Sequence, residues 1–121
     1  MKQLVIDCRH AAAQARFWSA ALDDSEIRGY DEVEIARLAS LGRTPETDPC
    51  VIVDGPPFEL CFREVGAAAV VKNPLHLDLA TSQRTAEAQR LVDLGATIVE
   101  TFESHTWMRD PEGNDFCITD A

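Results

Sequence analysis

A short run in the second half of the chain places two ionisable side chains at strand spacing. In Leu75–Leu79, leucines alternate with His76 and Asp78, which is the period-two pattern of a strand with one buried face. An imidazole beside a carboxylate can bind a metal, transfer a proton or form an ion pair. His76 is therefore either a ligand or acid/base group or a hydrogen-bonding pocket residue. For Asp78 three roles stay open: orienting His76, acting as a base, or pairing with Arg63.

A second run, Phe58–Val65, alternates in the same way. Its polar positions are Glu59, Cys61 and Arg63. Glu59 and Arg63 lie four residues apart along a strand, which is too far for direct contact. The pattern predicts a second strand with one polar face.

Charge and composition narrow the class of protein. The 121 residues suffice for one domain, or for two small modules sharing a core. Eleven basic against twenty-one acidic residues give a net charge of −10, which argues against binding nucleic acid or an anionic membrane. The N-terminal residues lack an export signal and the four cysteines show no CxxC spacing, so we expect reduced thiols in a cytoplasmic protein.

Hydrophobic periodicity and turn residues predict alternating strands and helices. An Asp31/Glu34 capping box starts the second predicted helix and Gly42 ends it. The predicted strands are 3–8, 27–30, 50–54, 58–65, 75–79, 96–102, 105–109 and 116–119. The predicted helices are 11–22, about 32–41, and a third that begins after the N-cap Ser82 and ends at Gly95.

The two halves of the chain repeat each other. Gln3–His10 matches His76–Gln83, and Gly55–Leu60 matches Gly113–Ile118, so we predict an α+β fold with two βαβββ modules. Module 1 spans about residues 1–66, a linker 67–73, and module 2 about 74–121. The side chains expected under the helices are Leu4, Ile6, Phe58, Leu60, Phe62, Leu75, Leu77, Leu79, Phe116 and Ile118. Those expected on the opposite, concave face are Gln3, Asp7, Glu59, Cys61, Arg63, His76, Asp78, Cys117 and Thr119.

This arrangement resembles the vicinal oxygen chelate superfamily, and within it the small bacterial glyoxalase/bleomycin-resistance/dioxygenase-like proteins. The motifs that carry the resemblance are Ala15–Trp18 after the first strand, the Leu75–Leu79 strand and the ending Asp110–Cys117. The resemblance implies a single domain over 1–121 in which eight strands curl into a cup, with the helices on its convex face. It also implies a homodimer and, in many members, one divalent metal bound by the first and last strand of each module.

The four positions that the resemblance assigns to the metal are Gln3, Glu59, His76 and Cys117. Amide, carboxylate and imidazole groups suit zinc, nickel, manganese or iron. Cys117 stands where the family's metal enzymes carry glutamate, and its thiolate would be oxidised easily beside a redox-active iron. The predicted ligand set is therefore incomplete.

Two classes of function remain open. A metal-dependent lyase, isomerase or dioxygenase of the glyoxalase type would use Glu59 or Asp78 as the base. A metal-free protein would instead bind a planar small molecule in the cup, as bleomycin-sequestering members do. An enzyme without metal, using Asp78 or His76 as acid/base, lies between them. We favour a small-molecule pocket with an incomplete metal site, lined by Asp7, Cys61, Arg63, Trp107 and Thr119.

Overall fold

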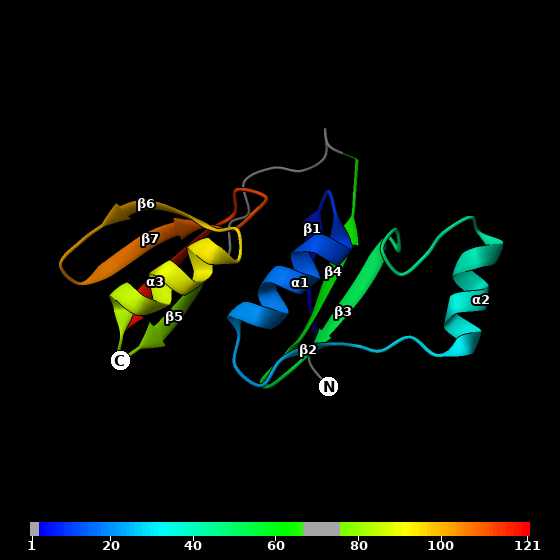
Figure 1. The fold of residues 1–121 in the computed structure, drawn as a ribbon, viewed down its shortest axis with the longest axis horizontal. Helices are drawn as coiled ribbons and strands as arrows, with labels where there is room; N and C mark the ends of the chain where they lie inside the picture. The colour runs from blue at the N-terminus through cyan, green and yellow to red at the C-terminus, as the bar shows by residue number, and fades with distance from the viewer. Residues whose placement is uncertain (1–2, 67–75) are drawn as a thin grey trace. The chain divides into compact units, whose positions relative to one another are not determined.

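The computed structural model describes residues 3–66 and 76–121, and the chain forms two compact units, Met1–Val70 and Val71–Ala121 (Figure 1). The first unit contains β1 (Gln3–Cys8), α1 (Ala11–Ala21), β2 (Glu26–Ile27), α2 (Glu32–Ser40), β3 (Cys50–Asp54) and β4 (Glu59–Glu64). The second contains β5 (Leu77–Thr81), α3 (Arg84–Asp93), β6 (Thr97–Thr101), β7 (His105–Arg109) and β8 (Asp115–Asp120). The predicted linker, 67–73, lies outside the described residues.

Both units have the same sheet topology. The strand order is β1-β4-β3-β2 in the first unit and β5-β8-β7-β6 in the second. The first and last strand of each unit pair in parallel, and the other neighbours are antiparallel. The α+β fold with two βαβββ modules is thus confirmed, and the first unit adds α2 between its second and third strands.

One helix packs on each sheet. In α1 the buried residues include Ala11, Ala15 and Trp18, and in α3 the buried residues are Ala88 and Leu91. The sheet residues beneath them include Phe62 in the first unit and Phe116, Ile118 and Met108 in the second, all fully buried. Alternation along each strand leaves the polar residues on the face away from the helix.

Two residues predicted to pack under the helices, Phe58 and Leu75, are not confirmed there. Phe58 is 38% exposed, because β4 begins at Glu59 and Phe58 belongs to the turn before it. The prediction that Phe58 packs under the helices is therefore wrong. Leu75 lies outside the described residues.

A side-chain cap sets the start of α2 but not that of α3. Asp31 caps α2, since its Oδ1 accepts a hydrogen bond of 2.8 Å from the Glu34 N–H. In Figure 1, α2 stands to one side of the first unit's sheet, beyond β3. The N-cap of α3 is Gln83 rather than Ser82, and no cap hydrogen bond comes from its side chain.

No helix within residues 3–66 and 76–121 is long and apolar enough to cross a membrane.

Candidate functional site

The polar face of the first unit centres on Glu59. The β1–β4 ladder places Gln3 directly opposite Glu59. Gln3 Nε2 donates to Glu59 Oε2 at 3.1 Å, and Arg28 Nη2 donates to Glu59 Oε1 at 2.7 Å. Both carboxylate oxygens therefore already accept a hydrogen bond from a protein group.

Arg28 also holds a second carboxylate. Its Nε and Nη2 donate to the two oxygens of Asp54, at 3.0 and 2.6 Å. These hydrogen bonds lower the pKa of Asp54 and raise the pKa of Arg28 above its ordinary value. The backbone N–H of Arg28 bonds to the Ile52 carbonyl at 2.8 Å, which fixes the residue beside β3. The sequence prediction assigned Arg28 no role, although it alternates with Glu26 along the β2 region.

Farther along the same ladder, Asp7 lies opposite Arg63. Arg63 donates to Asp7 Oδ1 through Nε at 3.1 Å and through Nη2 at 2.8 Å. The guanidinium of Arg63 thus has a carboxylate partner within its own unit. Both side chains are about half exposed, so this ion pair adds little stability.

Cys61 lies between these charged pairs on β4 and is buried. Its Sγ is 3.0 Å from the Sγ of Cys50 on β3. Burial, followed by the contact with Cys50, raises the pKa of Cys61 to about 12. The thiol is therefore protonated at neutral pH.

In the second unit, His76 and Asp78 lie together. The His76 Nε2 is 3.4 Å from Asp78 Oδ1, and both side chains are more than half exposed. This geometry favours the role in which Asp78 orients the imidazole. The β5–β8 ladder places Cys117 opposite Asp78, two residues along from His76. The strand register therefore differs between the two units at this point. Gln3 and Glu59, which correspond to His76 and Cys117 in the repeat, lie directly opposite each other.

Cys117 is half-buried, and its thiol is not set up as a ready thiolate. Burial raises its pKa, and the carboxylates of Asp78 and Asp115 raise it further. The thiol therefore stays protonated at neutral pH unless a bound cation offsets the negative charge of these two carboxylates.

Trp107 lies opposite Cys117 on β7. Asp115 Oδ1 accepts hydrogen bonds from Trp107 Nε1 at 3.0 Å and from Arg109 Nε at 3.1 Å. The Arg109 Cζ lies 5.4 Å from the centre of the Trp107 ring, a cation–π contact. Asp115 thus binds both the Trp107 indole and the Arg109 guanidinium that lies over its ring.

Thr119 belongs to the same face and pairs with His105 across the ladder. Asp115 and Arg109 were not among the predicted site residues. The alternation of residues along the last strand could have indicated Asp115, since Asp115 shares its face with Cys117 and Thr119.

The four predicted metal positions fall into two pairs, Gln3 with Glu59 in the first unit and His76 with Cys117 in the second. In the first unit the donor set does not fit a cation as it stands, because a guanidinium lies 2.7 Å from Glu59. A metal at Glu59 would have to displace the Arg28 guanidinium. Within residues 3–66 and 76–121, no three His, Cys, Asp or Glu side chains are grouped to hold a metal ion.

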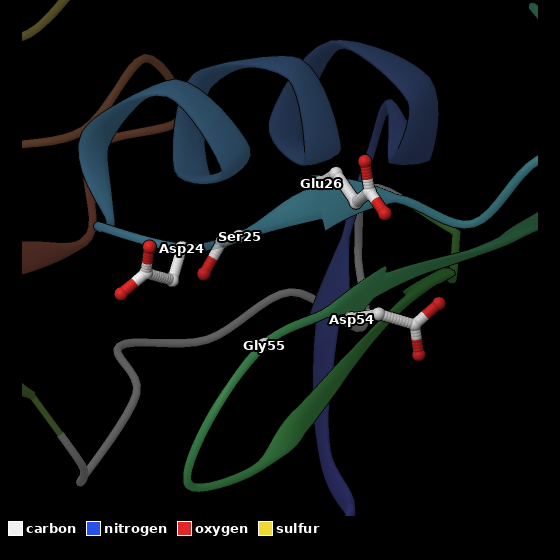
Figure 2. A pocket seen from close by; sticks show the side chains of 5 residues that line it. All are labelled: Asp24, Ser25, Glu26, Asp54 and Gly55. Carbon is white, nitrogen blue, oxygen red and sulfur yellow. The ribbon is translucent and has the colours of Figure 1, made fainter.

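A separate acidic pocket of about 460 Å³ lies at the β2–β3 end of the first unit (Figure 2). Figure 2 shows the Asp24, Glu26 and Asp54 side chains pointing in different directions. Gly55 closes the pocket, and a Cβ there would clash with the Ser25 Oγ. Since Asp54 is already bound to Arg28, we assign no metal to this pocket.

A model of the glyoxalase-like domain family matches residues 3–119. The chain belongs to this family. It is accordingly a member of the vicinal oxygen chelate superfamily, as the sequence motifs predicted. No curated protein matches the chain.

Solved structures share the glyoxalase-like fold at low sequence identity. A glyoxalase/bleomycin resistance protein/dioxygenase family enzyme from Burkholderia phytofirmans PsJN has a TM-score of 0.64 and 14% identity, covering 98% of this chain and 96% of that one. A glyoxalase-related enzyme from Fulvimarina pelagi has a TM-score of 0.63 and 17% identity, covering 100% and 87%. Oxidase ChaP-H2 has a TM-score of 0.64 and 15% identity, covering 100% and 92%. At these identities the likeness shows the fold alone.

Proposed function

We propose that this glyoxalase-like chain binds a planar small molecule, neutral or cationic, without a complete metal site. The observation that carries the proposal is the engagement of Glu59, whose two oxygens accept from Arg28 and Gln3. A carboxylate bound in this way serves as a fixed element of a polar surface. It would be a poor metal ligand or base, because the Arg28 guanidinium, 2.7 Å away, offsets its negative charge and would repel a cation.

The ligand class follows from the face of the second unit. Trp107 offers a flat aromatic surface whose orientation Asp115 fixes, and planar ligands stack on such rings. Two carboxylates, Asp78 and Asp115, lie near Cys117, and one guanidinium, Arg109, is bound to Asp115. Burial, followed by the negative charges of Asp78 and Asp115, raises the pKa of Cys117. Together with a net charge of −10, this favours a neutral or cationic ligand over an anion.

Tryptophan fluorescence tests this proposal directly, because the chain has two tryptophans. In a Trp18→Phe variant, Trp107 is the single reporter. We expect benzamidine and benzamide to change its emission saturably, and benzoate to act more weakly. A Trp107→Phe variant, which keeps Trp18, is the matched control and should show no such change.

Two results would overturn this proposal. The first is the absence of a saturable change with all three probes. The second is tightest binding of benzoate, which would contradict the inferred charge of the face.

A second candidate is a lyase or isomerase in which His76 transfers a proton. The 3.4 Å contact between His76 Nε2 and Asp78 Oδ1 supports it, since a carboxylate can orient an imidazole for proton transfer. Deuterium exchange into hydroxyacetone, followed by proton NMR, distinguishes the two candidates. Exchange that is lost in both His76→Gln and Asp78→Asn would establish the enzyme, and a binding protein gives no exchange above the buffer rate.

We further infer that the protein is a homodimer. Strand β6 lies at the edge of its sheet, and all five of its residues are exposed, including Ile98 and Val99. An apolar edge strand is a surface that proteins normally cover. Light scattering should give twice the chain mass for the wild type and the chain mass for Ile98→Lys, whereas a monomeric wild type would refute the dimer.

A further inference from the structure

Two thiols of the first unit meet on neighbouring strands. Cys50 is the first residue of β3 and Cys61 lies in the middle of β4. The antiparallel ladder places Ile52 opposite Cys61, so Cys50 is the diagonal neighbour on the same face. The two Sγ atoms are 3.0 Å apart. Both cysteines carry free thiols.

The two thiols differ in access. Cys50 is exposed, whereas Cys61 is only 6% exposed. Cys50 also forms part of the wall of a small pocket of about 120 Å³, together with Arg28, Tyr30 and Asp48. A small solute therefore reaches Cys50 first, and Cys61 lies directly behind it.

The backbone at Cys50 is held in place. Asp48 is buried, its Oδ1 accepts a 3.0 Å hydrogen bond from the Cys50 N–H, and its Oδ2 accepts a 2.7 Å hydrogen bond from the Tyr30 hydroxyl. This anchor keeps the start of β3 beside β4. The exposed thiol therefore stays within reach of its neighbour.

We propose that Cys50 and Cys61 form a reversible dithiol–disulfide site that reacts with small peroxides at Cys50. The thiolate of Cys50 attacks one oxygen of hydrogen peroxide, the O–O bond breaks, and hydroxide leaves and takes up a proton as water. The product is a sulfenic acid on Cys50. Cys61 then attacks that sulfur, an S–S bond forms, and the sulfenic oxygen leaves as a second water with the Cys61 proton.

In sum, two thiols are oxidised to one disulfide, and one peroxide is reduced to two waters. A dithiol reductant reverses the step by thiol–disulfide exchange. The high pKa of Cys61 fits its role as the second thiol, since it is protonated and unreactive until a sulfenic acid forms beside it. This modification does not depend on the ligand proposed above.

Peptide mapping of the full-length wild type tests the proposal. Both cysteines fall in the tryptic peptide Thr44–Arg63. After peroxide treatment and alkylation in denaturant, we expect this peptide to carry no alkyl group and to be lighter by the two thiol hydrogens. Further cleavage after Asp54 should leave its two halves joined, and dithiothreitol should restore both alkylation sites.

Three variants define the order of reaction. Cys117→Ser should behave like the wild type. Cys61→Ala should accumulate a sulfenic acid on Cys50 that dimedone traps, and Cys50→Ser should leave Cys61 reduced. The proposal is overturned if the wild-type peptide is doubly alkylated after peroxide that fully oxidises free cysteine in the same tube. It is also overturned if Cys50 is joined to Cys8 or Cys117 instead.

Discussion

The two units share one sheet topology but carry different chemistry on the face away from the helix. In the first unit the charged side chains form pairs: Arg28 holds Asp54 and Glu59, and Arg63 holds Asp7. In the second, Asp115 also forms an ion pair, with Arg109, but it accepts a further hydrogen bond from the indole of Trp107.

The difference shows which features a repeated fold retains. The buried positions beneath each helix keep large apolar residues, whereas the polar face has diverged from one unit to the other. A metal site shared between modules would need matching donors from both faces. In the first unit Glu59, the carboxylate at a predicted metal position, is bound to Arg28, which is why we place ligand recognition on the aromatic face of the second unit.

The largest expected effects come from the buried phenylalanine in the core of each unit. Phe62 in β4 and Phe116 in β8 are fully buried, so Phe62→Ala and Phe116→Ala should each lower the free energy of unfolding by about 3–5 kcal/mol. Urea unfolding measures both, and Phe→Leu at each position is the milder control. A loss below about 1 kcal/mol at either position would show that the two cores are not equivalent.

The turn before β8 should be the next most sensitive feature. Asp110 is buried, and its Oδ1 accepts from the N–H groups of Glu112 and Asn114, both at 2.9 Å. Asp110→Ala leaves these donors without their acceptor and should cost about 1–3 kcal/mol. Glu103→Ala, at an exposed position of the same unit, is the control. Equal stability of the two variants would contradict the assigned role of Asp110.

Alkaline pH should affect the first unit through Tyr30. Burial, followed by the hydrogen bond to Asp48, raises the pKa of this single tyrosine above its ordinary value of 10.0. The unfolded chain therefore loses this proton at lower pH than the folded chain, so stability should fall as pH rises above about 10. Tyrosinate absorbance should show a higher titration midpoint in the native protein than in urea, and coincident midpoints would refute the buried Tyr30–Asp48 contact.

The smallest effects concern the two sheet-packed helices. Their N-cap residues, His10 for α1 and Gln83 for α3, provide no side-chain cap hydrogen bond. His10→Asp and Gln83→Asp should each stabilise the protein by roughly 0.5–1 kcal/mol. Asp31→Ala should lose a similar amount, because Asp31 caps α2. Destabilisation by both new aspartates would show that these helix starts cannot accept a cap.

Local patterns predicted much of the fold. The bounds of β3 and β7 were predicted correctly, and so was the Asp31 cap, because alternation and capping depend on neighbours in sequence. The β2 strand is Glu26–Ile27 rather than the predicted 27–30, since its length depends on pairing with β3. Phe58 was misplaced for a similar reason, as the turn before β4 ends one residue later than the alternation suggested.

The site was less predictable than the fold. Alternation predicted that Glu59, Cys61 and Arg63 share a face, but it could not supply their partners. Arg28, the residue after β2, lies more than thirty residues from Glu59 in sequence, and such contacts follow from strand order. The offset of Cys117 from His76 depends likewise on ladder register, which the repeat alone does not determine.

Metal content per chain tests the central claim most directly. The untagged protein, purified without chelators, is incubated with zinc, nickel, manganese or ferrous iron, desalted and measured by mass spectrometry, alongside His76→Ala and Arg28→Ala. We predict no stoichiometric metal in the wild type and the same result in His76→Ala. In Arg28→Ala, where Glu59 no longer has its guanidinium partner, any change in metal content should be an increase. One metal per wild-type chain, lost in His76→Ala, would contradict the account and place the chain among the metal-dependent enzymes of its family.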